Sequence, residues 1–187
     1  MTLNAREWIG YEPVLRDTAL PLQHMVDATV RAQGGYWRAG SAVMRLLEEC
    51  GEVADAANHC DFTEECADII IVSTCIANQL DVSLADGYVA IGLHENLEVA
   101  QQRDLDHGFA ALVSAAGHVA RGVNATIGDK PLRPGHPPIN LAVVIAQLHQ
   151  CAAALAPSRT PPIHSVIRTK LATAKVRDSG RFTPLTR

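Results

Sequence analysis

The sequence predicts an all-α fold. Apolar residues recur at helical spacing along most of the chain, and no stretch shows the sustained apolar and polar alternation of a half-buried strand. Aromatic residues make up only 4% of the 187 residues, which disfavours β-rich folds. With 48% hydrophobic and 19% charged residues, the composition is that of a folded globular protein rather than a disordered or fibrous one. We therefore expect a helical bundle.

Four helices are expected in the first half of the chain. The turn signal Gly34-Gly35 ends the first helix, Ser41 can cap the second, and Thr63 and Ser83 open the third and fourth. The expected ranges are 14–32, 41–57, 63–80 and 83–103. The apolar stripe of the second helix is expected to run through Leu46, Leu47, Cys50 and Val53.

The second half of the chain resembles a shorter repetition of the first. Leu112–Ala120 repeats Leu46–Ala54 with Gly, Val and Ala in register, and Asn140–Val144 answers Glu65–Ile69. The additional residues between the two later segments fall in the loop GDKPLRPGHPP. The pattern indicates an internal duplication.

We expect the two copies to comprise residues 1–104 and 105–187 and to pack as one compact unit. A last helix is predicted over 166–178. The second copy is degenerate, because it carries no acid where the first copy does. The residues at those positions are Ser114, Ala115, His118, Asn140 and Val143.

Charge is segregated along the chain. Residues 46–102 contain twelve acidic and no basic residues, whereas the chain from Arg103 onward contains eleven basic and four acidic ones. This segregation indicates attraction between the halves, or one site that needs a cation on one side and anion-binding groups on the other. Nucleic-acid binding by the basic half is disfavoured, because the acidic half would repel the polymer.

The sequence also predicts a cytoplasmic protein without a membrane partner. No apolar run reaches the roughly 18 residues of a membrane-spanning helix. The N-terminal segment MTLNAREWIG has no apolar core of the kind an export signal needs. The five cysteines are an odd set without CxxC spacing, which is typical of reduced thiols.

Two acidic clusters lie on neighbouring predicted helices. Glu48, Glu49 and Glu52 lie within about one turn, and Glu65 and Asp68 lie one turn apart on the next helix. The acidic block contains no base to relieve their repulsion. Two explanations stay open at this stage. The acids form a solvated face, or their oxygens surround a hard divalent cation such as Mg²⁺.

The solvated face suits the two clusters unequally. Glu48 and Glu52 lie opposite the apolar stripe of their helix, as solvated residues would. Glu65 and Asp68 align instead with the apolar side of theirs, where an ionised carboxylate without a partner is costly. Carboxylates of the two adjacent helices could together form an oxygen-only cage for a cation, and the spacing alone leaves both explanations open.

The spacing EExxE, twelve residues, then ExxD resembles the signature of the MazG-like all-α nucleoside triphosphate pyrophosphohydrolases. It reads here as EECGE at 48–52 and ECAD at 65–68. The flanking LL before the first acids, IIIV after the last and LDVSL before the next helix are similar to that family too. The resemblance covers about residues 30–104, and a weaker similarity continues to residue 178.

The resemblance implies hydrolysis of a nucleoside or deoxynucleoside triphosphate to the monophosphate and pyrophosphate. It implies that Mg²⁺, or Mn²⁺ in its place, is held by Glu49, Glu52, Glu65 and Asp68. Glu48 would orient or deprotonate the attacking water. The family commonly works as dimers, which implies pairing of two chains.

This chain departs from the family at the substrate-binding helix, which usually carries a Lys, an Asn and an Arg. The corresponding residues are Asn96, Ala100 and Arg103 in the first copy, and Lys170, Ala174 and Arg177 in the second. A composite site would combine the acids of the first copy with Lys170 and Arg177, with Arg103 as a further contact and Trp37 stacked on the base. Alternatively, Lys170 and Arg177 solvate a terminal helix, and Trp37 closes the core.

Two other functions are compatible with the sequence. The missing Lys and Asn favour a catalytically silent helical module that binds nucleotides or a partner protein, whereas the intact acids oppose it. Contact of the basic half with nucleic acid is the third function, and it would produce salt-sensitive binding.

Overall fold

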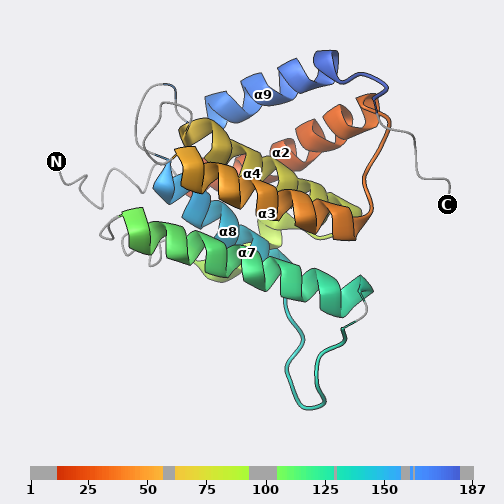
Figure 1. Cartoon of the computed structure of the whole chain (residues 1–187), viewed down its shortest axis with the longest axis vertical. Helices are drawn as coiled ribbons and strands as arrows, with labels where there is room; N and C mark the ends of the chain where they lie inside the picture. Colours follow the sequence, from red (N-terminus) through yellow and green to blue (C-terminus); the bar gives the residue numbers. More distant parts are fainter. Residues whose placement is uncertain are drawn as a thin grey trace.

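The computed structural model describes residues 12–56, 62–92, 105–128, 130–156, 161 and 163–181. Within these residues all regular secondary structure is helical, so the predicted all-α class is confirmed (Figure 1). The helices are α2 (Glu12–Ala32), α3 (Ala39–Ala56), α4 (Phe62–Gln79), α5 (Leu84–Ile91), α7 (Leu105–Ile127), α8 (Leu141–Leu155) and α9 (Ile163–Arg177).

Two of the predicted helix boundaries are confirmed at the level of single residues. Gly34 and Gly35 both have φ of 115°, a backbone region that glycine enters without steric cost. The N–H of Gly35 donates to the carbonyl of Val30 at 2.9 Å and so closes the turn after α2. At the start of α5, the Ser83 hydroxyl accepts a hydrogen bond from the backbone N–H of Asp86 at 3.2 Å.

Other boundaries differ from the prediction. α3 begins at Ala39, before the expected cap at Ser41. The N–H of Ala42 already donates to the carbonyl of Arg38 at 3.0 Å, so Ser41 lies inside the first turn. α4 begins at Phe62, so a hydrophobic residue rather than a polar one is its first helical residue.

The fourth predicted helix is shorter than expected. α5 ends at Ile91, where Gly92 adopts a left-handed conformation with φ of 50° and donates to the carbonyl of Val89 at 3.3 Å. Residues 93–104 lie outside the described part of the chain. The predicted substrate contact Arg103 is one of them.

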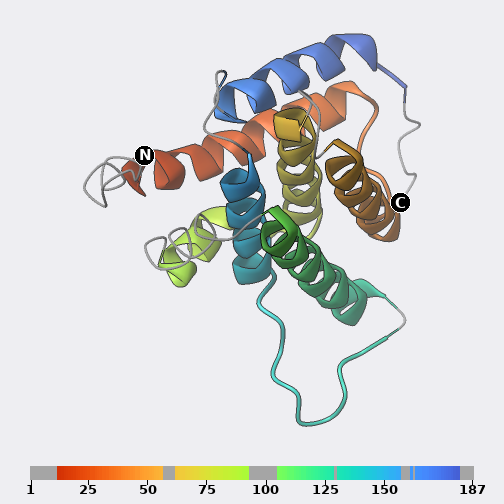
Figure 2. The same ribbon diagram turned by 60° about the vertical axis from the view of Figure 1, so that its left-hand side comes forward.

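The helices pack as two pairs with three further helices around them. α3 packs on α4 and α7 packs on α8, and the two pairs meet through α4 with α8 and α3 with α7. α5 covers α8, α9 covers α4, and α2 contacts α4, α5 and α9 (Figures 1 and 2). α4 is therefore enclosed by neighbours, and most of its residues are buried.

No single helix among the described residues is long and apolar enough to cross a membrane. α4 and α5 meet the length and composition criterion only when taken together, across a bend of 114°.

A buried polar network joins α4, α5 and α8. The Nε2 atom of His149 lies 2.8 Å from Ser73 Oγ, and its Nδ1 atom lies 2.6 Å from the Tyr88 hydroxyl. Ser73 Oγ also donates to the carbonyl of Ile69 at 2.6 Å, so we assign the proton of His149 to Nε2. The Tyr88 hydroxyl then donates to Nδ1. His149 is only 3% exposed, and its burial lowers its pKa to about 3.

Because His149 must stay neutral to fit this network, we expect it to contribute to acid unfolding. Between pH 6.5 and about 3 the unfolded chain binds one more proton at this residue than the folded chain does. The free energy of unfolding should therefore fall as the pH falls, by about 1.4 kcal/mol per pH unit from this group. In urea unfolding from pH 7 to 4.5, His149→Gln should show a shallower slope than wild type. His118→Gln, at an exposed position on α7, should keep the wild-type slope; equal slopes for both variants would contradict this account.

Candidate metal centre and cavity

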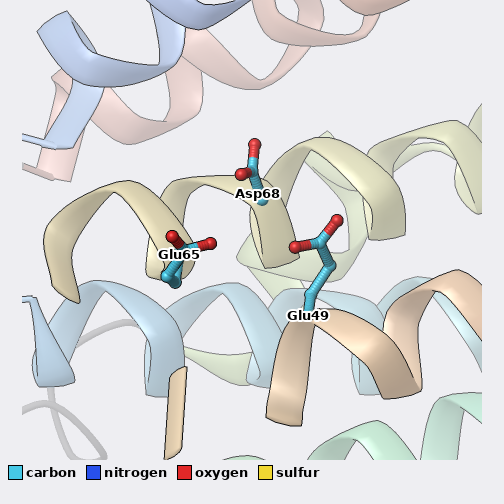
Figure 3. Close-up of side chains that lie close together, drawn as sticks. All are labelled: Glu49, Glu65 and Asp68. Carbon is cyan, nitrogen blue, oxygen red and sulfur yellow. The ribbon is translucent and has the colours of Figure 1, made fainter. Parts of the chain in front are cut away.

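The acidic residues of the two motifs lie on helices that pack against each other. Glu49 lies on α3, while Glu65 and Asp68 lie one turn apart on the same side of α4 (Figure 3). Each of the three carboxylates offers one oxygen atom, and these oxygens all lie within 4.8 Å of one another. The packing of α3 on α4 thus brings both motifs to one point.

Glu49 is buried inside this group. Glu49 is 1% exposed, because it lies in the apolar stripe of α3 between Leu46 and Val53. Oε1 accepts from Arg45 Nη2 at 2.7 Å, whereas Oε2 is buried without a partner. Burial, the neighbouring Glu52 carboxylate and the charge of Asp68 raise the pKa of Glu49, against the opposing effect of Arg45. A buried carboxylate oxygen without a partner is costly, so this atom has an unused acceptor position that a bound ion or a water molecule could fill.

The two acids on α4 are half-buried. Burial raises the pKa of Asp68, and the hydrogen bond from Lys170 opposes that rise. Burial likewise raises the pKa of Glu65, with Lys170 lowering it. A positive charge close to Glu49, Glu65 and Asp68 would therefore stabilise their ionised forms.

Glu48 and Glu52 lie on the outer side of α3, with side chains 61% and 47% exposed. This outward position is the one expected for residues opposite the apolar stripe of the helix. The expectation that no base relieves the acids is wrong, because Arg45 immediately precedes the acidic block. Its Nη1 atom lies 2.8 Å from Glu48 Oε2 and 3.6 Å from Glu52 Oε1. The spacing of Arg45 to the acids, three and four residues along one helix, was the available signal.

A cavity of about 1040 Å³ opens beside the acids, between α2, α3, α4 and α9. Its size is at the upper end of ligand pockets, which measure about 300–1,000 Å³. Six predicted site residues line it: Glu48, Glu49, Asp68, Lys170, Arg177 and Trp37. Glu52 and Glu65 are not among the lining residues.

The cavity brings basic residues of the second half against acids of the first. Lys170 Nζ on α9 contacts Asp68 Oδ2 and donates to the carbonyl of Glu64 at 3.0 Å. Arg177 also lines the cavity, and its Nη2 atom pairs with Asp178 Oδ2 at 2.8 Å. The alternative in which Lys170 only solvates a terminal helix is therefore wrong, because its ammonium group ties α9 to α4.

Comparison with known families agrees with this geometry. Residues 39–91 match the model of the MazG nucleotide pyrophosphohydrolase domain. This segment of the chain is similar to the MazG domain. It spans α3, α4 and α5, and thus both acidic motifs. No curated protein and no solved structure gave a significant match to the chain.

The acidic residues that α3 and α4 bring together fit a hard divalent cation. The donor atoms are all carboxylate oxygens, the ligands that Mg²⁺ and Mn²⁺ prefer. The partnerless Oε2 of Glu49 supplies an observation independent of the clustering. Glu49, Glu65 and Asp68 would hold the ion, leaving further coordination positions for water and phosphate. Glu52, expected as a fourth ligand, lies outside this group of three.

Saturating Mg²⁺ is expected to raise the melting temperature of the protein, and to raise it more at pH 8.5 than at pH 6.5. A proton on Glu49 must leave before a metal binds, so each pH unit below its raised pKa weakens metal binding by about tenfold. Ligand at a hundred times its Kd stabilises a folded protein by about 2.7 kcal/mol. Differential scanning fluorimetry, with NaCl of equal ionic strength as the control, measures both shifts. Equal shifts at the two pH values would contradict this expectation.

Proposed function

We propose that the protein is a Mg²⁺-dependent nucleotide pyrophosphohydrolase, which converts a nucleoside or deoxynucleoside triphosphate to the monophosphate and pyrophosphate. The observation that carries the proposal is the partnerless, buried oxygen of Glu49, which lies among the acids of a MazG segment. The adjoining cavity, with acids on one wall and cations on the other, supports a phosphorylated substrate.

The bound metal would neutralise charge on the triphosphate and polarise the phosphoryl group under attack. Glu48 lines the cavity from the exposed side of α3, which supports its role in orienting the attacking water and accepting its proton. Lys170 and Arg177 would contact phosphate oxygens as these develop charge. Trp37 would stack on the base, and Arg103 is proposed as a further phosphate contact.

We also propose that the chain is a tandem of two related units, 1–104 and 105–187, of which only the first retains the acids. The packing pattern supports this relationship: α3 and α4 pair as α7 and α8 do, and α9 covers α4 as α5 covers α8. In this arrangement the second unit contributes Lys170 and Arg177 to the site of the first.

The reaction is tested by product analysis. Wild-type protein with Mg²⁺ is incubated with each common ribonucleoside and deoxynucleoside triphosphate, and the products are separated by anion exchange. We expect monophosphate and pyrophosphate in equal amounts from at least one substrate, and no product in EDTA. Diphosphate with inorganic phosphate would indicate another reaction. Nucleotide binding without any turnover would favour a catalytically silent module.

We propose that the protein acts in the cytoplasm as a dimer. The thiols of Cys50, Cys66 and Cys75 are buried, and burial raises their pKa values, which supports a structure built from reduced cysteines. On α3 the apolar side chains of Met44 and Leu47 are 62% and 71% exposed, which supports a contact with a second chain. Light scattering after size exclusion should give twice the 20.0 kDa chain mass, and a monomer would contradict the dimer.

A further inference from the structure

Two cations of the chain contact the same carboxylates that would bind a metal. Arg45 Nη2 lies 2.7 Å from Glu49 Oε1, and Lys170 Nζ pairs with Asp68 Oδ2. Arg45 approaches from the same helix as Glu49, whereas Lys170 approaches from α9, far along the sequence. The side chains of Arg45 and Lys170 are 38% and 23% exposed, so both cations are partly withdrawn from water.

We propose that Arg45 and Lys170 compete with the divalent cation for these carboxylates and move to the phosphates when metal and triphosphate bind together. This inference rests on the proposed function. A metal ion at Glu49 and Asp68 would lie within a few ångströms of both cationic groups, and like charges at such separations repel strongly inside a protein. Metal binding to the nucleotide-free protein is therefore opposed by the chain itself.

The triphosphate removes this opposition. Arg45 and Lys170 both line the cavity, so their charged groups have space to turn away from the acids. A guanidinium pairs with phosphate in bidentate geometry, and an ammonium group binds phosphate as a point charge. Metal and triphosphate should then bind with positive coupling, each strengthening the binding of the other.

Metal binding to the nucleotide-free protein separates competition by Arg45 and Lys170 from a purely substrate-binding role, which predicts no change in metal binding when either cation is removed. Removing either cation should strengthen metal binding to the nucleotide-free protein, although it weakens phosphate binding. The measurement is the Kd for Mn²⁺ alone, from the electron paramagnetic resonance signal of free Mn²⁺. Lys170→Met and Arg45→Met should each lower this Kd at least fivefold. Lys170→Gln, which retains a donor for the Glu64 carbonyl, should act like Lys170→Met.

Matched controls lie elsewhere on the protein. Lys175→Met changes an exposed lysine on α9, and Arg121→Met changes an exposed arginine on α7, neither of which lines the cavity. Both should keep the wild-type Kd for Mn²⁺, and circular dichroism checks that every variant is folded. At saturating Mn²⁺, calorimetric titration with inorganic tripolyphosphate should show at least fivefold weaker binding for the Lys170 and Arg45 variants.

The outcomes separate the inference from the proposed function. Unchanged or weaker Mn²⁺ binding in the Lys170 and Arg45 variants would overturn the inference. The metal site itself would still stand in that case if Glu49→Gln lost the Mn²⁺ that wild type binds. Failure of Mn²⁺ to bind any of the proteins, wild type included, would overturn both.

Discussion

Glu49→Gln is expected to lower triphosphate turnover by about 10³-fold or more while the helices stay folded. Glutamine has nearly the same shape, so the packing of Glu49 between α3 and α4 is preserved. The substitution removes the negative charge and one metal-binding oxygen from the buried position. The loss should therefore appear in kcat, because the metal acts on the reacting phosphoryl group.

The same substitution should not destabilise the protein in EDTA at pH 8. The pKa of Glu49 is raised, so above the ordinary carboxyl pKa the folded chain must hold a proton that the unfolded chain releases. This difference costs folding free energy, and glutamine removes that cost. Asp55→Asn, an exposed change on the same helix, is the matched control and should keep wild-type turnover. Pyrophosphate release at saturating Mg²⁺ and circular dichroism provide the two readouts. A Glu49→Gln enzyme with more than a tenth of wild-type turnover would exclude Glu49 as a ligand.

Gly87→Ala is expected to destabilise the fold by about 3 kcal/mol, the upper part of the range for overpacked cores. α5 and α8 approach so closely at Gly87 that an added Cβ would lie 2.2 Å from the carbonyl oxygen of Ala142 and 3.1 Å from Ala146 Cβ. The first obstacle is backbone, so it yields only if the two helices separate. Their separation would also disturb the contacts of Tyr88 with His149.

The control for this prediction is a glycine substitution that is expected to raise the free energy of unfolding instead of lowering it. Gly117 lies within α7, and an added Cβ there meets no atom within 4 Å. Gly117→Ala should therefore stabilise the protein by about 0.5–1 kcal/mol, because alanine favours the helix more than glycine does. Urea unfolding measures both variants. A small or stabilising effect of Gly87→Ala would contradict the close approach of α5 and α8.

The helices could be predicted from the sequence because their signals are local. The spacing of apolar residues predicts each helix. Gly34 and Gly35 end α2, and Ser83 caps α5, through contacts within a few residues of their own positions. The start of α3 was predicted less well. The carbonyl of Arg38 accepts the first hydrogen bond before Ser41 can cap the helix.

The site was predictable only in part, because it depends on how helices rotate and meet. The expected apolar stripe of α3 included Leu47, which is 71% exposed, while Glu49 is the buried residue instead. α3 is therefore rotated about its own axis relative to the expected orientation. The rotation turns Glu49 toward α4 and Glu52 toward solvent, and no local pattern determines it. The contact of Lys170 with Asp68 depends on α9 packing on α4, which is a long-range event.

The central claim is that Glu49, Glu65 and Asp68 form a divalent metal site. Its most direct test is the anomalous difference map of crystals grown with Mn²⁺ and a non-hydrolysable triphosphate analogue. We predict a Mn²⁺ peak within coordination distance of these three carboxylates, with Lys170 and Arg45 turned from the acids toward phosphate oxygens. A map without a peak at this position, with Lys170 still paired to Asp68, would contradict the account.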